Sequence, residues 1–158
     1  MNIYNFQFNK LDGTPLNLAD YRGKPILLVN TASKCGFTPQ YKELQELWDK
    51  YRDKGLVVVG VPSNDFANQE PGNSGEIACF VKDHFAVSFP ITDKNKVTGT
   101  DAHPCYQAIA KQVGWLGKPH WNFYKYLFNK NGELVEWFSS ITKPNAKKVI
   151  KAVEQELK

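Results

Sequence analysis

The sequence predicts an α/β fold in which helices flank a central mixed β-sheet, preceded by an N-terminal β-hairpin. Two observations support this prediction. Segments with strand character alternate with segments of helical periodicity along most of the chain, which favours a sheet containing parallel strands. Near the carboxyl end, Asn131-Gly132 joins two strand candidates, and this dipeptide is typical of a tight hairpin turn. We therefore expect the last two strands to be antiparallel.

The first half of the chain predicts a hairpin and then two strands separated by a helix. Short apolar segments at 6–8 and 16–18 flank the turn residues 12–15 and predict the hairpin. The apolar runs 26–31 and 56–61 are typical of strands buried on both faces. Between them, Thr38 and Pro39 predict the N-cap and first residue of a helix that Gly55 ends near residue 53.

The second half of the chain continues this alternation of helices and strands. In order, we expect a loop at 62–72, a helix at 76–84, a short strand at 89–91, a helix at 104–113, a loop at 114–120, strands at 123–128 and 133–138, and a helix at 144–157. This order is the layout of a thioredoxin-like fold. The sequence shows no domain boundary and no internal repeat, so we expect residues 1–158 to form one domain.

Composition excludes several classes of function. The net charge of +4 comes from scattered lysines, and Arg22 and Arg52 are the only arginines, which argues against nucleic-acid binding. No apolar run approaches the roughly 20 residues of a membrane span, and the N-terminus has no basic and apolar signal segment. Three cysteines without a C-x-x-C motif fit a reducing compartment, so we expect a cytoplasmic protein without a disulfide framework.

Cys35 is the strongest candidate for a reactive residue. It lies between the apolar strand candidate 26–31 and a helix start, where unpaired backbone N–H groups and the helix dipole favour a thiolate. Thr38 occupies the position that a second cysteine would need for rapid dithiol cycling. The three histidines show no metal-ligand spacing, and no motif supports any of them as the base of a Cys–His hydrolase.

A single activated thiolate suits attack on the O–O bond of a peroxide, which leaves a sulfenic acid. Such a reaction needs neutral donors that hold the thiolate and polarise the departing oxygen. Two polar segments can supply them: residues 64–72, after the second central strand, and Trp121-Asn122, before the antiparallel strand. Loops at the ends of neighbouring strands converge in a wound α/β sheet.

Three segments together resemble the glutathione peroxidase family. NTASKCGFT at residues 30–38 resembles the family's catalytic signature, NQEPG at 68–72 the segment carrying its active-site glutamine, and WNFYKY at 121–126 its Trp-Asn-Phe segment. They occur in the family's order. The resemblance implies a cysteine-type, short bacterial or plant-like peroxidase. In that family's scheme Cys35 is the peroxidatic thiol, and Gln69, Trp121 and Asn122 are its hydrogen-bonding partners.

The resemblance also implies activity toward hydrogen peroxide and organic or lipid hydroperoxides, in defence against oxidative stress. It implies no metal or organic cofactor, with glutathione or thioredoxin as the external electron donor. The short segment 114–120 resembles the mostly monomeric members, so we expect a monomer or weak dimer with a site open to bulky substrates. Peroxiredoxins are a weaker match, because Leu28 and Ala32 replace the proline and threonine of their motif.

The resolving step is where the chain departs from its thioredoxin-using relatives. Their resolving cysteine falls at Lys82 here, and Cys79 lies three residues earlier on about the same helix face. Cys79 is thus either a possible resolving cysteine or, the interpretation that we favour, a small buried apolar residue. Without it, glutathione would be the donor. Cys105 is expected in the core. A module that senses oxidation without turnover is the alternative from another class.

Other conspicuous side chains receive structural interpretations. Trp48 and Trp137 fit the core faces of their helix and strand. Five lysines carry the charge that attracts the carboxylates of glutathione, but we expect them to be ordinary solvated residues: Lys34, Lys42, Lys82, Lys118 and Lys125.

Overall fold

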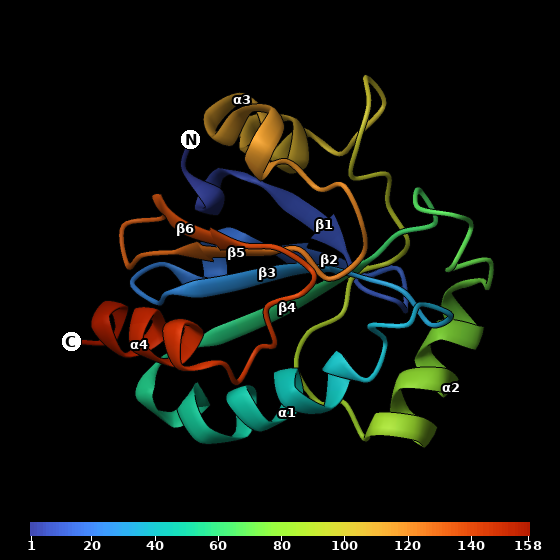
Figure 1. Cartoon of the computed structure of the whole chain (residues 1–158), viewed down its shortest axis with the longest axis horizontal. Coiled ribbons are helices and arrows are strands. Elements are labelled where there is room, and N and C mark those ends of the chain that lie inside the picture. The colour runs from blue at the N-terminus through green and yellow to red at the C-terminus, as the bar shows by residue number, and fades with distance from the viewer.

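A four-stranded mixed sheet forms the centre of the computed structural model, which describes residues 1–158 (Figure 1). The strand order is β4-β3-β5-β6, with bounds Val57–Pro62, Ile26–Thr31, Lys125–Phe128 and Leu134–Phe138 respectively. β3 pairs in parallel with β4 and antiparallel with β5, and β5 pairs antiparallel with β6. The mixed sheet with two antiparallel strands at its end is therefore confirmed.

Helices cover both faces of the sheet. α1 (Gln40–Tyr51) and α4 (Lys147–Glu156) lie below it in Figure 1, and α3 (Pro104–Gly117) lies above. α2 (Ser74–Phe85) stands at the right-hand end of the molecule. The expected N-terminal hairpin is present as a separate two-stranded sheet, β1 (Gln7–Asn9) and β2 (Pro15–Asn17). No helix is long and apolar enough to cross a membrane.

The core divides into two layers because successive strand residues point to opposite faces. Leu27 and Val29 of β3 pack with the layer that contains α1 and α4, whereas Ile26 and Leu28 pack with the layer that contains α3 and the hairpin. All six residues of β3 and all six of β4 are buried. The uninterrupted apolar runs in the sequence follow from this burial on both faces.

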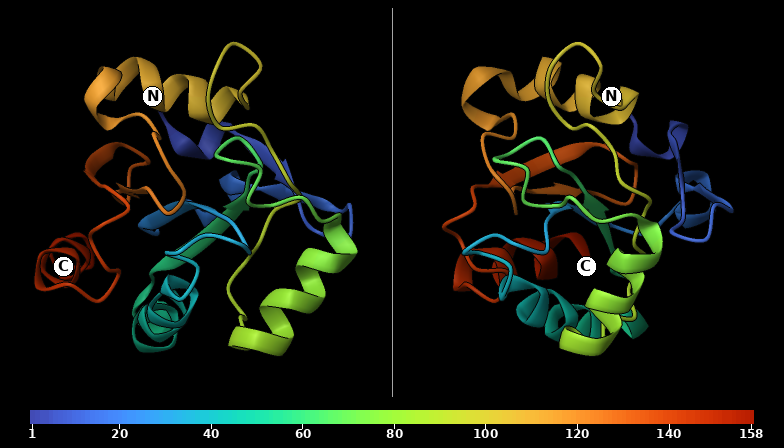
Figure 2. Two further views of the ribbon diagram at one scale, coloured as in Figure 1. Left: turned by 45° about the vertical axis from the view of Figure 1, so that its right-hand side comes forward. Right: turned by 90° about the vertical axis from the view of Figure 1, so that its right-hand side faces the viewer.

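Three loops meet at one edge of the sheet. The loops that follow β3 and β4 leave the sheet at the edge where β5 begins, since β5 runs antiparallel to β3 (Figure 2). The backbone extends this pairing past the strand, because the N–H of Phe123 donates to the carbonyl of Asn30 at 2.6 Å. The candidate residues of the 30–38, 68–72 and 121–126 segments are thereby brought to the same edge.

Four sequence-based boundaries need correction. α1 begins at Gln40, with Pro39 rather than Thr38 at its N-cap. α3 runs on to Gly117, because Gly114 takes φ +71° and lets a further helical turn follow the kink. α4 begins at Lys147, after a turn that contains Pro144.

The fourth correction concerns the expected strand 89–91, which is reduced to one isolated bridge between Gly60 and Ile91. Its pairing with β4 is confined to Gly60, whose N–H donates to Pro90 and whose carbonyl accepts from Thr92. Pro90 has no N–H of its own to donate, which keeps the ladder from extending.

Candidate active site

Cys35 lies in the loop between β3 and α1, where it is a free cysteine with 8% of its surface exposed. The backbone N–H of Phe37 donates to Cys35 Sγ at 3.3 Å. A backbone donor of this kind favours negative charge on the sulfur, as the position before a helix does. The sulfur is therefore largely sheltered from solvent and is contacted by one backbone donor.

Thr38 shapes the Cys35 loop instead of capping the helix. Its Oγ1 accepts the N–H of Cys35 at 2.9 Å and donates to the carbonyl of Ala32 at 2.8 Å. The N–H of Thr38 in turn donates to the carbonyl of Cys35 at 3.0 Å. These three bonds close the loop on both sides of the cysteine and leave the helix to begin two residues later.

Gln69 belongs to the loop after β4, which is held against the Cys35 loop. The N–H of Lys34 donates to the carbonyl of Gln69 at 3.0 Å. Within the loop, Ala67 and Asn68 adopt φ of +54° and +53°, an uncommon conformation for residues with a Cβ. Asn64 supports it by accepting the N–H of Glu70 at 2.9 Å and donating to the side chain of Asn68 at 3.2 Å.

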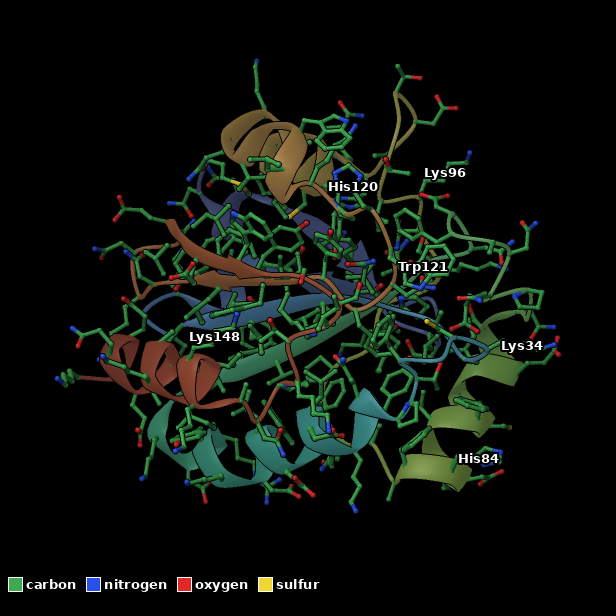
Figure 3. The ribbon with its side chains drawn as sticks, in the orientation of Figure 1. Lys34, His84, Lys96, His120, Trp121 and Lys148 are labelled. Atoms are coloured by element: carbon green, nitrogen blue, oxygen red, sulfur yellow. The ribbon has the colours of Figure 1, made fainter.

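Trp121 and Asn122 come from the segment before β5 and reach the same place. The side chain of Asn30 donates to the carbonyl of Trp121 at 2.9 Å, which fixes the segment against β3. Asn122 is fully buried, and its Nδ2 donates to Oε1 of Gln69 at 2.9 Å. Trp121 is half-buried and packs on the core layer that includes Cys35; Figure 3 shows it at the same end of the sheet as Lys34.

The structure thus brings together all four residues singled out from the sequence, although none of the three partners hydrogen-bonds to Cys35 Sγ. Asn122 engages only Oε1 of Gln69, and neither Gln69 Nε2 nor Trp121 Nε1 donates to another protein group. A sulfur nucleophile beside uncommitted neutral donors can attack an oxygen atom and break the bond from it to a neighbouring atom. The donors then stabilise the group that leaves.

Glu70, next to Gln69, is a buried carboxyl with an unsatisfied oxygen. It is 1% exposed, and its Oε2 has no hydrogen-bond partner. Burial raises the pKa of the Glu70 carboxyl, while the nearby Ser33 hydroxyl and the charge of Lys94 act in the opposite direction. Glu70 also borders a cavity of about 260 Å³, which Ser33, Lys34 and the first turns of α2 help to line.

The two remaining cysteines differ sharply in their surroundings. Cys105 is fully buried, as predicted, and burial raises the pKa of its thiol far above the usual range. Cys79 is exposed on α2, so the favoured prediction that it is a buried apolar residue is wrong. Ile77 and Val81 are the buried residues of that helix. Cys79 lies two positions from each of them, so it falls on a different face of the helix. Cys79 and Cys35 are both free thiols in this structure.

Lys125 is a buried residue that sequence reasoning did not identify. It was expected at the surface, yet it is fully buried at the start of β5. Its Nζ donates to the carbonyl of Ser139 at 3.1 Å, that of Ser140 at 3.4 Å, and that of Thr142. Burial lowers the pKa of Lys125 to about 7, Glu43 opposing this shift and Lys148 adding to it.

The position of Lys125 in its strand was the available signal of that burial. Alternation along β5 puts Lys125 on the same face as the core residue Leu127, the face that α1 and α4 cover. A lysine on a buried face needs acceptors, and an ammonium group has three N–H donors for the three carbonyls of the following loop.

Comparison with known proteins identifies the family. The family model described as glutathione peroxidase matches residues 3–110. The chain belongs to the glutathione peroxidase family. It is 47% identical over 146 residues to a glutathione peroxidase homolog, BsaA, of Halalkalibacterium halodurans, covering 91% of this chain and 93% of that one. It is 43% identical over 151 residues to a hydroperoxy fatty acid reductase of Synechocystis, covering 90% and 89%.

A third relative and a solved structure support the same family, and a more distant structure supports the fold. A glutathione peroxidase-like peroxiredoxin of Schizosaccharomyces pombe is 47% identical over 135 residues, covering 84% of this chain and 85% of the other. The crystal structure of GPX1 of T. cruzi superposes with a TM-score of 0.78 at 31% identity, covering 99% of this chain and 97% of that one. A thioredoxin-family thiol:disulfide interchange protein of Chlorobium tepidum matches at TM-score 0.67 and 17% identity, covering 97% and 93%. The fold is thioredoxin-like, and the protein is a peroxidase of the glutathione peroxidase family.

Replacing Thr38 by valine should destabilise the Cys35 loop. Valine has the shape of threonine but neither accepts the N–H of Cys35 nor donates to Ala32, so two buried groups lose their partner. We expect the free energy of unfolding, measured in urea, to fall by about 1–3 kcal/mol. Thr38→Ser retains the hydroxyl and should recover most of the loss; equal stability of the valine variant and the native protein would contradict this role.

Replacing Glu70 by glutamine should stabilise the protein at neutral pH. Since the folded-state pKa of Glu70 is raised, its favourable contribution is complete below the unfolded pKa of about 4.3 and is lost as pH rises through the folded value. Glu70→Gln should therefore gain stability over the native protein at pH 7, and the difference should shrink near pH 4. Urea unfolding at both pH values measures it.

The exposed Glu46 provides the matched control for this measurement, because its charge stays in water. Glu46→Gln should show no comparable pH-dependent gain. A Glu70→Gln variant whose stability difference is the same at pH 4 and pH 7 would contradict the assigned burial of charge.

Proposed function

We propose that the protein reduces hydrogen peroxide and organic hydroperoxides, including lipid hydroperoxides, with Cys35 as the peroxidatic nucleophile and Gln69, Trp121 and Asn122 as its partners. The observation that carries this assignment is the hydrogen bond from Asn122 to Gln69, which leaves Gln69 Nε2 uncommitted at the edge of the sheet where Cys35 lies. The free indole N–H of Trp121 provides a second neutral donor at that edge.

The chemistry begins with attack of the Cys35 thiolate on one oxygen of the peroxide. An S–O bond forms as the O–O bond breaks, sulfur is oxidised to the sulfenic acid, and the departing oxygen takes up a proton to become water or an alcohol. The donors on Gln69 and Trp121 stabilise the negative charge that develops on that oxygen. Neutral amide and indole groups suit this task because they stay protonated at every physiological pH.

An external thiol then returns the sulfenic acid to the thiol. Glutathione displaces water to give a mixed disulfide with Cys35, and a second glutathione releases the cysteine and leaves oxidised glutathione. This route needs no metal, flavin or nucleotide, since both electrons come from the two thiols. The similarity to a hydroperoxy fatty acid reductase of Synechocystis supports bulky lipid-derived peroxides as substrates.

A second candidate for the reductant is thioredoxin, and the exposure of Cys79 favours it. In this scheme the Cys79 thiol attacks the Cys35 sulfenic acid, water leaves, and thioredoxin reduces the resulting disulfide. The description of the S. pombe relative as a peroxiredoxin is consistent with such a cycle. α2 carries two buried residues, Ile77 and Val81, and Phe80 and Phe85 are only partly buried against the core, so its local unwinding would expose a limited apolar surface.

The wider setting proposed for this peroxidase follows from its composition. We place it in the cytoplasm as a single domain of residues 1–158, a monomer or weak dimer without a nucleic-acid partner or stable membrane insertion. The alternative is a redox-sensing module, in which Cys35 is oxidised once per chain and no thiol donor supports turnover.

Replacing Cys35 by serine should abolish peroxide consumption. Serine preserves the backbone contacts of the loop but is a far weaker nucleophile at neutral pH. With glutathione in excess, steady-state consumption of hydrogen peroxide should fall to the uncatalysed rate, while the circular dichroism spectrum and unfolding midpoint stay close to native. Cys105 and Cys79 remain in this variant, so near-native turnover would show that Cys35 is not the nucleophile.

The two reductants are separated by a Cys79→Ser variant. If glutathione is the donor, this variant should retain native turnover with glutathione, and mass spectrometry of the peroxide-treated native protein should find a sulfenic acid or glutathione adduct at Cys35. A Cys35–Cys79 disulfide, with loss of thioredoxin-driven turnover in Cys79→Ser, would instead establish the thioredoxin cycle. Stoichiometric oxidation without turnover by either donor would identify the sensing module.

A further inference from the structure

The backbone that carries Asn122 is strained and depends on outside support. Phe123, the next residue, adopts φ +64°, a left-handed conformation that is an outlier for a bulky side chain. Such a conformation costs stability and persists only where the surrounding structure over-determines it. Asn30 supplies part of that support from β3, by binding the carbonyl of Trp121 and the N–H of Phe123.

Ser140 supplies support from the opposite side. Its hydroxyl donates to the carbonyl of Asn122 at 2.5 Å, across 18 residues of sequence. Ser140 is buried, with 5% of its surface exposed, so water does not replace this bond readily. The carbonyl of Asn122 is thus fixed by a side chain from the connection between β6 and α4, a segment that no sequence motif marked.

Two buried side chains hold Ser140 in turn. Gln40 of α1 donates from Nε2 to the carbonyl of Ser140 at 2.7 Å, and Lys125 donates to the same carbonyl at 3.4 Å. Lys125 also binds the carbonyls of Ser139 and Thr142, on both sides of it. We call this arrangement of Gln40, Lys125 and the 139–142 segment the Ser140 clamp. It ties α1, β5 and the β6–α4 connection to one hydroxyl group.

We propose that Ser140 is a positioning residue for the peroxidase reaction, which through the carbonyl of Asn122 sets the orientation of the Asn122–Gln69 pair. This inference rests on the proposed function, and it adds a residue that does not touch the peroxide. The clamp fixes the backbone of Asn122, and Asn122 Nδ2 engages Gln69 Oε1. In this proposal, that bond orients the Gln69 amide so that its Nε2 can donate to the departing oxygen. A shift of the Asn122 backbone by a fraction of an ångström misaligns both amides.

The test compares two reactions of the same thiol in Ser140→Ala. Oxidation of Cys35 by hydrogen peroxide needs aligned donors for the departing oxygen, whereas alkylation by iodoacetamide releases iodide and needs only an accessible thiolate. We expect the rate constant for oxidation by peroxide, measured by stopped-flow, to fall roughly 10- to 100-fold. The rate constant for alkylation, measured by mass spectrometry, should stay within about twofold of the native value. Ser140→Thr, which keeps the hydroxyl, should recover the peroxide rate.

A double-mutant cycle with Asn122→Ala tests the route of the effect. Since Ser140 acts through Asn122, adding Ser140→Ala to Asn122→Ala should slow the peroxide reaction by much less than Ser140→Ala does alone. Ser88→Ala is the control, because it also removes a hydroxyl that bonds to a glutamine of α1, Gln45, but lies outside the clamp. It should leave both rate constants unchanged.

Several outcomes would overturn the inference. Unchanged peroxide oxidation in Ser140→Ala would show that the clamp does not position the site. An equal loss of peroxide oxidation and alkylation would show a general disturbance of the Cys35 loop. If Ser140→Ala fails to fold, Lys125→Met is the second variant, because its side chain is of similar length but makes none of the three carbonyl contacts. It must then show the same loss of peroxide oxidation without loss of alkylation. Failure of the native protein to react with peroxide would refute the proposed function instead.

Discussion

The pairing of β3 with both of its neighbours is the constraint on which the rest of the site depends. β3 delivers Cys35 from its carboxyl end, runs parallel to β4, whose following loop carries Gln69, and runs antiparallel to β5, which begins beside that same end. Asn30 extends this pairing by one residue, since its side chain and backbone bind the 121–123 segment. A register shift in either pairing would separate Cys35 from Gln69 and Trp121, the donors proposed for it.

Several residues around the site are held in conformations or environments that cost stability. Ala67, Asn68 and Phe123 adopt positive φ, and Glu70 is a buried carboxyl with an unsatisfied oxygen. Functional sites commonly store strain of this kind, and the surrounding fold offsets it. Here the offset comes from the two apolar layers on either face of the sheet and from side-chain hydrogen bonds between distant elements.

The fold and the four site residues could be predicted because their signals are local. Continuous apolar runs mark strands buried on both faces, Asn131-Gly132 marks the hairpin turn, and a cysteine between a strand and a helix marks the reactive thiol. The resemblance of three separate segments to one family then indicated Gln69, Trp121 and Asn122 as the proposed partners of Cys35.

What the sequence did not reveal depends on tertiary contacts between distant residues. Thr38 is typical of a helix N-cap in the sequence, but in the structure its hydroxyl accepts the N–H of Cys35 instead. Lys125 resembles a surface lysine in the sequence, but alternation along β5 places it on the face that α1 and α4 cover, and Ser140 belongs to no motif. Cys79 was misplaced because the buried stripe of α2 runs through Ile77 and Val81, a choice that depends on how the helix docks.

The relative oxidation rates of the two cysteines in one protein test the account most directly. Cys79 is exposed on α2, whereas Cys35 is 8% exposed in the loop whose Lys34 N–H binds the carbonyl of Gln69. With substoichiometric hydrogen peroxide and rapid trapping of sulfenic acid before mass spectrometry, we expect Cys35 to be oxidised at least about 100-fold faster than Cys79. Oxidation that follows exposure, with Cys79 modified as fast as Cys35 or faster, would contradict the claim that the site activates Cys35.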